Sequence, residues 1–216
     1  MSEASTLVTD EHFAYIASHT QPEDGFLRRL KDAARTAGIP PIWIAPEQAS
    51  FTQILLRAAR ATQVIEVGTL AGYSAIVMAR ALPEHGRVRT IEIVPAHAEF
   101  ARKWVAQSDV AGRIEVIEGA GMDVLKEFDD DSADAAFLDA DKKSYPLYLR
   151  ESLRIVRRGG LILVDNAFAF GELFAESPKD AEVAAVRAFN EHMAQVEGLQ
   201  SVIVPLGDGV WVGVRR

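Results

Sequence analysis

Apolar and polar residues alternate along this chain in blocks that predict strands and helices in turn. Short runs rich in apolar and β-branched residues recur after polar or glycine-containing segments, at 64–67, 87–93, 114–117, 135–138 and 161–164. Short runs of this kind are typical of strands buried on both faces of a parallel sheet. We expect helices in the segments between and after them, at 73–82, 95–109, 122–127 and 145–156.

Further elements are predicted at both ends of this alternation. Three helices are expected before the first strand, at 11–18, 23–37 and 46–61. A helix and two β-rich runs are expected after the last parallel strand, at 179–196, 200–205 and 210–214. The tight turn 206–209 makes those two runs an antiparallel pair. The pattern predicts an α/β fold, with a Rossmann-like, mostly parallel sheet, helices on both faces, an antiparallel C-terminal strand and extra N-terminal helices.

Composition narrows the class of protein. A chain of 216 residues, 49% hydrophobic and 25% charged, fits one domain, 1–216, in which we expect 1–45 to form a helical cap over the active site, a subunit interface or both. No apolar run is long enough to span a bilayer and no signal pattern is present, so we expect a cytoplasmic protein without a membrane partner. The absence of cysteine excludes disulfides and thiolate chemistry. A net charge of −8 argues against a nucleic-acid partner.

Acidic residues follow two of the predicted buried strands directly. Asp139 comes after 135–138, and Asp165-Asn166 come after 161–164. Because ligands of open α/β sheets bind beyond the carboxyl ends of the strands, these side chains should converge on one site. Oxygen ligands without Cys or His suit Mg²⁺ or a similar hard cation. An isolated acid at such a position is more often a helix cap or an Asx turn, but three polar ligands together favour a site.

The first strand-to-helix turn carries two glycines, Gly68 and Gly72, behind Glu66. Glycines here let the backbone approach a ligand closely, although a purely structural turn is the alternative. The spacing differs from the G-x-G-x-x-G of dinucleotide sites. The next strand contains Glu92, 24 positions after Gly68, near the separation of roughly 20 at which an acid meets ribose hydroxyls in related folds.

Four motifs together resemble the cation-dependent O-methyltransferases, the group that includes the catechol and caffeoyl-coenzyme A enzymes. They are Glu66-Val67-Gly68-Thr69…Gly72-Tyr73-Ser74, Leu138-Asp139-Ala140-Asp141-Lys142…Tyr145, Gly159-Gly160…Val164-Asp165-Asn166 and Pro205-Leu206-Gly207-Asp208-Gly209. The resemblance covers most of the chain from Pro46 onward. It implies a seven-stranded sheet with the last strand inserted antiparallel, S-adenosylmethionine (SAM) as cofactor, and a homodimer.

The resemblance also implies roles for particular residues. Cofactor contacts are expected from the residues matching Glu66, Gly68, Thr69, Ser74, Glu92, Ile93, Ala120 and Asp139. Metal ligands are expected at Asp139, Asp165 and Asn166, for Mg²⁺ or alternatively Mn²⁺ or Ca²⁺. Lys142 matches the catalytic base. A bound cation nearby would favour its neutral amine, which can accept a phenol proton.

Aromatic residues suggest the substrate wall. Phe168 and Phe170 follow Asn166 in a loop-like stretch where many relatives carry tryptophan, and Trp43 lies in an apolar segment expected over the cofactor. A small aromatic diol fits these features better than a coenzyme A thioester. Two other functions stay open: methylation of a hydroxylated tRNA nucleoside, and SAM binding without catalysis. The five histidines lie outside the motifs, and Arg157-Arg158 are expected in the last turn of a helix.

Overall fold

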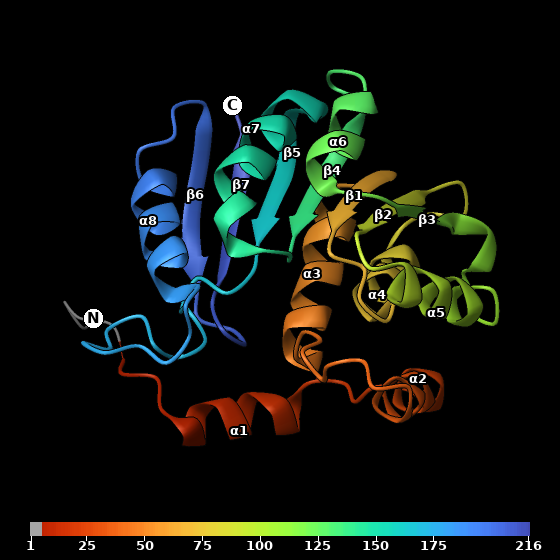
Figure 1. Ribbon diagram of the computed structural model, residues 1–216, viewed down its shortest axis with the longest axis horizontal. Helices are drawn as coiled ribbons and strands as arrows, with labels where there is room; N and C mark the ends of the chain where they lie inside the picture. The colour runs from red at the N-terminus through yellow and green to blue at the C-terminus, as the bar shows by residue number, and fades with distance from the viewer. Residues whose placement is uncertain (1–5) are drawn as a thin grey trace.

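One seven-stranded sheet organises the computed structural model, which describes residues 6–216 (Figure 1). Residues 1–5, the start of the predicted N-terminal cap, lie outside the described residues. The strand order is β3-β2-β1-β4-β5-β7-β6. The strands are β1 (Gln63–Val67), β2 (Arg87–Glu92), β3 (Ile114–Glu118), β4 (Ala133–Leu138), β5 (Val156–Val164), β6 (Leu199–Val204) and β7 (Val210–Arg215). Strands β1 to β5 pair in parallel, and β7 is antiparallel to both β5 and β6, so the predicted sheet is confirmed.

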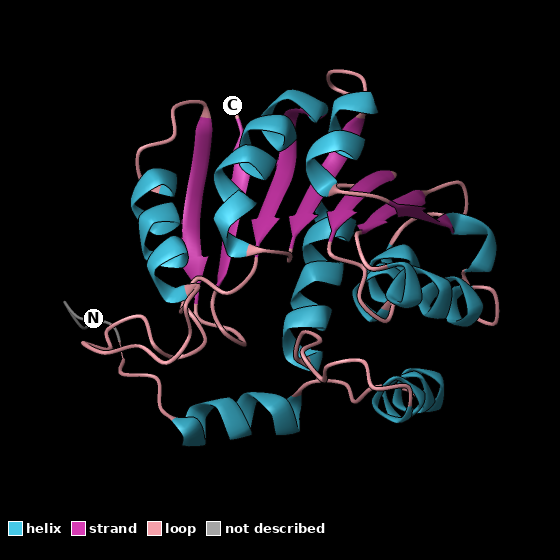
Figure 2. Cartoon of the chain, in the orientation of Figure 1, coloured by secondary structure: helices cyan, strands magenta, loops and turns pink. Residues whose placement is uncertain are grey.

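Helices cover both faces of the sheet, as predicted (Figure 2). One face carries α2 (Gly25–Thr36), α3 (Pro46–Ala58), α4 (Tyr73–Ala81) and α5 (Pro95–Val105). The other carries α6 (Gly121–Val124), α7 (Tyr145–Ile155) and α8 (Val183–Met193). Neighbouring residues of one strand enter different cores, since Val64 packs in the first layer and Ile65 in the second. Short 3-10 turns at 111–113, 125–127 and 142–144 complete the connections.

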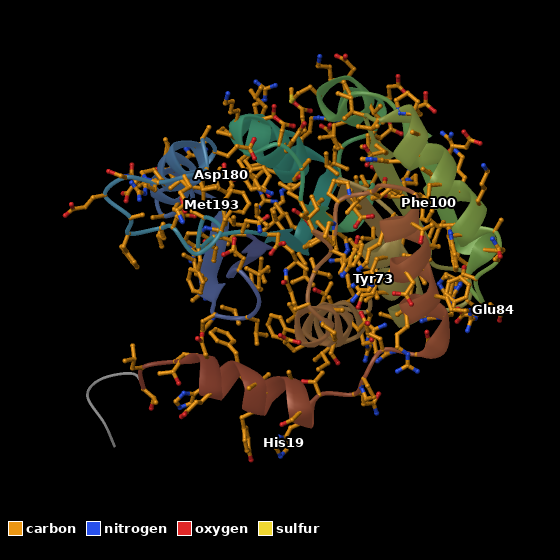
Figure 3. All side chains as sticks on the ribbon, turned by 60° about the horizontal axis from the view of Figure 1, so that its bottom comes forward. His19, Tyr73, Glu84, Phe100, Asp180 and Met193 are labelled. Carbon is orange, nitrogen blue, oxygen red and sulfur yellow. The ribbon has the colours of Figure 1, made fainter. Side chains whose placement is uncertain are left out.

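The first helix, α1 (Asp10–His19), lies apart from these layers, below the carboxyl ends of the strands in Figure 1. None of its residues is buried. Figure 3 shows His19 at its end, on the side away from the body of the protein. Within the described part of the chain, no helix is long and apolar enough to cross a membrane.

Several predicted helix limits differ from the structure by a few residues, and two of the predictions about helix ends fail for a local reason. The helix expected at 179–196 spans only Val183–Met193, because Lys179 N and Asp180 N donate to the Glu172 carboxylate, at 2.6 and 3.2 Å, in a turn before it. Arg157 and Arg158, expected at a helix end, lie in β5 instead. There Arg157 Nε donates to Asp134 Oδ1 of β4 at 2.6 Å.

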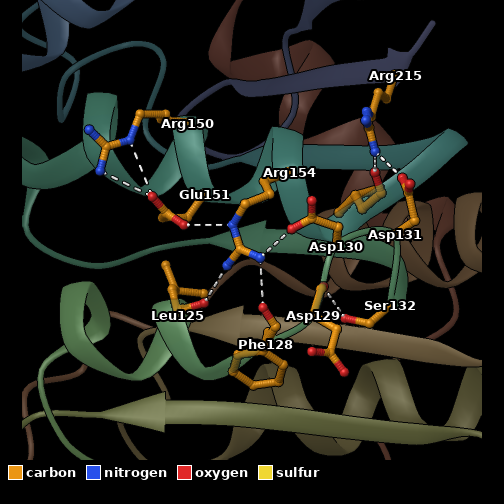
Figure 4. A network of polar contacts seen from close by, with 11 residues as sticks. Leu125, Phe128, Asp129, Asp130, Asp131, Ser132, Arg150, Glu151, Arg154 and Arg215 are labelled. Carbon is orange, nitrogen blue, oxygen red and sulfur yellow. Dashed lines mark hydrogen bonds and ion pairs between the residues drawn. The ribbon is translucent and has the colours of Figure 1, made fainter.

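Charged side chains hold together the end of the sheet where β4 and β5 begin. Figure 4 shows Arg154 of α7 at the centre of one network, donating to the carbonyl oxygens of Leu125 and Phe128 and pairing with Glu151 and Asp130. Because the guanidinium serves several partners at once, it joins the 3-10 turn at 125–127 to α7.

Asp134 forms a second such centre. Its Oδ2 accepts from Thr62 N at 2.7 Å, Thr62 Oγ1 at 2.8 Å and Gln63 N at 2.9 Å. Burial alone would raise the pKa of Asp134, but these bonds and Arg157 outweigh it and lower the pKa to about 2. The ionised carboxylate therefore stabilises the junction of β1, β4 and β5.

Asp134→Ala should lower the free energy of unfolding at pH 7 by about 1–3 kcal/mol, because it leaves partly buried donors without an acceptor. The folded-state pKa lies below the unfolded value, so this contribution is complete above about pH 4 and is lost as pH falls toward 2. Urea denaturation at several pH values measures both effects. Glu99→Ala, on an exposed ion pair with Lys103, is the control and should leave the midpoint unchanged. A parent–Asp134→Ala difference that persists undiminished at pH 2 would contradict the assignment.

Candidate active site

The register of the parallel strands places the predicted site residues along one edge. At the carboxyl ends, Gly68 N donates to Ile91 O and Asp139 N to Val67 O, both at 2.9 Å, and Asp165 N donates to Leu138 O at 3.0 Å. Each residue thus continues the sheet ladder by one step. The strand order reverses between β1 and β4, and such a switch point is where open α/β sheets bind ligands.

A cavity of about 1000 Å³ opens at this edge. Most of the predicted site residues line it: Trp43, Gly68, Thr69, Ser74, Glu92, Ile93, Ala120, Asp139, Lys142, Asp165, Asn166 and Phe170. Two do not. Glu66 is fully buried below the glycine loop, and Phe168 packs against Gly209 in the turn between β6 and β7.

The loop after β1 is held by the acid at the end of β2. Glu92 Oε2 accepts from Leu70 N at 2.8 Å, and Oε1 accepts from Val94 N at 2.9 Å. Gly68 has a φ of +106°, and a Cβ there would overlap the carbonyl oxygen of Asp139. The glycine is therefore required by the contact between two strand ends, whereas the sequence suggested a close approach to a ligand.

Beneath this loop lies a buried polar chain. Thr69 Oγ1 and Thr90 Oγ1 are 2.6 Å apart, and Thr90 Oγ1 donates to Glu66 Oε2 at 2.5 Å. Burial raises the pKa of Glu66 to about 8, so this carboxyl is largely protonated at neutral pH. Its Oε1 has no hydrogen-bond partner among residues 6–216, so this buried atom is left for a further group.

The strand-end residues Asp139, Asp165 and Asn166 offer side-chain oxygen atoms, the ligand type that hard cations prefer. Asp165 is 6% exposed, and burial, followed by repulsion from Asp139, raises its pKa. Gln48 of α3 donates to Asp165 Oδ1 at 2.6 Å, and Asn166 Nδ2 donates to Asp208 Oδ2 at 3.1 Å. No group of three or more His, Cys, Asp or Glu side chains within residues 6–216 could hold a metal ion. The candidate set therefore needs the amide oxygen of Asn166, which belongs to the hard ligand class.

Lys142 is 5% exposed and lies between two oxygens. Its Nζ is 3.1 Å from Asp139 Oδ1 and 2.7 Å from Tyr145 Oη. Tyr145 Oη in turn lies 3.3 Å from the carbonyl oxygens of Leu138 and Asp165, at the ends of β4 and β5. Burial, then the nearby carboxylates, raises the pKa of Tyr145, so it stays a neutral partner that fixes the lysine amine in place.

Several residues at the site were missed by sequence reasoning. Tyr145 and Asp208 belong to the recognised motifs, which could have flagged them. Gln48, Glu182 and His97 line the cavity but lie outside the sequence motifs. No local pattern in the sequence indicated that they belong to the site. Asp141 has structural bonds, since it accepts from Tyr148 Oη at 2.6 Å and Ser144 N at 3.2 Å.

Comparisons with known proteins point to one family. A model of the O-methyltransferase family matches residues 17–216. The chain is 34% identical over 205 residues to a catechol O-methyltransferase of Niastella koreensis, covering 94% of this chain and 90% of that protein. It is 35% identical over 201 residues to a catechol O-methyltransferase of Mycobacterium tuberculosis, with 93% and 91% covered. A crystal structure of the Streptomyces achromogenes O-methyltransferase TomG with SAM, which takes part in tomaymycin synthesis, shares 30% identity at a TM-score of 0.83, with 97% and 99% covered.

This chain therefore belongs to the O-methyltransferase family, with the class I fold. It is an S-adenosylmethionine-dependent O-methyltransferase. The individual roles of Lys142, the strand-end acids and the cofactor residues stay predictions.

Gly68→Ala should destabilise the protein by several kcal/mol and weaken SAM binding, because the new Cβ pushes Asp139 away from β1. Gly38→Ala is the matched control. Gly38 also has a positive φ, +76°, but has no atom within 4 Å of its Cβ position, so it should cost only about 1–2 kcal/mol and leave SAM affinity unchanged. Thermal unfolding and calorimetric titration with SAM measure the two quantities. Equal losses in both variants would show that the Asp139 contact is unimportant.

Proposed function

We propose that this enzyme methylates one hydroxyl of a catechol-like small molecule with the help of a divalent cation. The observation that carries the proposal is the position of Lys142 Nζ, 3.1 Å from Asp139, in the same cavity as Asp165, Asn166 and the glycine loop. A base, hard ligands and a SAM loop are thereby close enough to act on one substrate. Two relatives are named catechol O-methyltransferase, which supports the substrate class.

Asp139, Asp165 and Asn166 would hold the cation, with Mg²⁺ as the first choice and Mn²⁺ or Ca²⁺ as alternatives. When bound, the cation would supply Lewis-acid chemistry that favours loss of a phenol proton, whose ordinary pKa is about 10. The cation would also offset the repulsion between the carboxylates of Asp139 and Asp165, which is the second cause, after burial, of the raised pKa of Asp165.

Lys142 Nζ would accept the proton of the reacting hydroxyl. As the oxygen bonds to the methyl carbon of SAM, the carbon–sulfur bond breaks and its electrons stay on sulfur, which leaves S-adenosylhomocysteine. Tyr145 Oη and Asp139 Oδ1 hold the amine beside the strand ends. Alignment of this kind supplies much of the catalysis in a displacement between two bound groups.

Apolar walls support an aromatic substrate. Phe170 and Trp43 line the cavity together with Ile42 and Met122. Phe170 is 39% exposed and Ile42 68% exposed, so both lie at the mouth of the cavity. The Phe170 ring centroid is 5.9 Å from Lys142 Nζ. Phe170 could therefore contact the aromatic ring of a substrate held beside the base.

Methyl transfer from labelled SAM to catechol should occur with Mg²⁺ and stop with a chelator. Lys142→Ala should lower kcat by about 10²–10⁴, the range for loss of a general base, and its residual rate should rise with pH because hydroxide can replace the amine.

Asp165→Ala should instead weaken cation binding, measured by calorimetry. Lys143→Ala, the exposed neighbour outside the cavity, is the control and should turn over normally. Undiminished activity in the presence of chelator would rule out the role of the cation.

We further propose that the N-terminal cap forms part of a homodimer interface. The ten-residue helix α1 buries none of its residues, Tyr15 is 65% exposed, and isolated helices of this length are marginal in water. A second copy would cover this face. Helix α2, by contrast, buries Leu27, Leu30 and Ala34 in the core and belongs to the protomer.

Deletion of residues 1–19 should convert a dimer into a monomer while leaving the core folded, because α1 contributes no buried residue. Sedimentation velocity measures the oligomeric state, and circular dichroism checks that the core stays folded. A truncated protein that sediments as the same oligomer as the parent would place the interface elsewhere.

A further inference from the structure

The segment after β5 contains three non-glycine residues with left-handed backbone. Asn166 has a φ of 64°, Ala169 of 54° and Phe170 of 61°. L-amino acids avoid this region because the Cβ crowds the next carbonyl group, and such residues persist only where their surroundings hold them. Asn166 and Phe170 both line the active-site cavity, so whatever holds this backbone also sets the geometry of the site.

The carboxylate of Asp208, from the turn between β6 and β7, holds this segment. Its Oδ2 accepts from Phe170 N at 2.7 Å and from Asn166 Nδ2 at 3.1 Å, and its Oδ1 accepts from Gly171 N at 3.1 Å. Phe168 N also donates to the backbone oxygen of Asp208 at 2.8 Å. Hydrogen bonds to an ionised acceptor are stronger than neutral ones, so this one side chain contributes much of the restraint.

We propose that Asp208 is a positioning residue for methyl transfer: it orients the Asn166 amide so that Oδ1 is presented to the cation, and it fixes Phe170 at the cavity mouth. The proposal rests on the proposed function, because it takes Asn166 as a cation ligand. An amide has one donor end and one acceptor end. Since Nδ2 is committed to Asp208, the oxygen is left for the cavity that Asn166 lines.

The neighbouring residues leave little freedom for another arrangement. A Cβ at Gly207 would overlap Gln48 Oε1, and Gln48 Nε2 donates to Asp165 Oδ1 at 2.6 Å. On the other side, a Cβ at Gly209 would lie 2.8 Å from the Phe168 ring. The turn that carries Asp208 therefore packs closely against Gln48 of α3 and against Phe168 of the segment that Asp208 restrains.

Two variants separate the hydrogen bonds from the charge. Asp208→Ala removes all three acceptor contacts. Asp208→Asn can place its oxygen at the position of Oδ2, where it still accepts from Asn166 Nδ2 and Phe170 N and loses only Gly171 N. The asparagine variant should therefore keep the orientation of Asn166, and the alanine variant should lose it.

The first measurement is a titration of the protein with Mn²⁺ alone, without SAM or substrate. Electron paramagnetic resonance monitors the binding of the metal. Loss of a partner that orients a metal ligand typically weakens binding 10–100-fold, which we expect for Asp208→Ala. Asp208→Asn should stay within a few-fold of the parent. The second measurement is amide hydrogen exchange at Phe170 and Gly171 in the metal-free protein, which should accelerate at both residues in Asp208→Ala and mainly at Gly171 in Asp208→Asn.

Glu172→Ala is the matched control. Its carboxylate also accepts two backbone N–H groups of the same connection, from Lys179 and Asp180, but it does not line the cavity. It should speed exchange at those two amides and leave Mn²⁺ affinity and exchange at Phe170 unchanged.

The outcomes distinguish this proposal from the proposed function. Parental Mn²⁺ affinity in Asp208→Ala, or equal losses in the Asn and Ala variants, would overturn the orienting role. If the parent itself binds no Mn²⁺ and transfers no methyl group, the proposed function fails with the orienting role. Exchange at Phe170 then reports only whether Asp208 restrains the segment.

Discussion

The backbone contact between Gly68 and Asp139 is the constraint on which the site depends. It brings the glycine loop after β1 against the end of β4 at the point where the strand order reverses. No side chain fits between them, so a change in the loop would also displace the first strand-end acid. The candidate SAM loop and the candidate cation ligands thus share one edge, an arrangement that suits catalysis by alignment of two bound groups.

Burial of acids at this edge opposes stability and prepares the site. Burial raises the pKa of Glu66 and, with repulsion from Asp139, that of Asp165. Gln48 and Lys142 lower the pKa of Asp165 and so offset part of this rise. At the opposite end of the sheet, Asp134 is satisfied by four hydrogen bonds and its pKa is lowered. The pKa of a buried or partly buried acid therefore depends on whether hydrogen-bond donors outweigh burial, as they do at Asp134 and do not at Asp165.

Much of the fold could be predicted because its signals are local. Buried strands, a glycine turn and a tight hairpin each depend on a few consecutive residues, and the register of the sheet then brings the strand-end acids together. Gln48 and Glu182 could not be found, since their place at the site comes from packing between distant elements. The pair Phe168 and Phe170 shows a further limit: left-handed backbone at Ala169 and Phe170 breaks the simple alternation, so only one ring reaches the cavity.

The connection between β5 and α8 is longer than the other turns at this edge of the sheet. Its two ends contribute cavity residues, Asn166 and Phe170 on one side and Glu182 on the other, while Phe174 in its middle is 92% exposed. The hairpin turn at 206–209 is packed closely instead, since even an added Cβ would overlap Gln48 or crowd Phe168. Redesign of the substrate range can therefore begin with substitutions at the exposed Phe174, while the edge of the sheet stays constant.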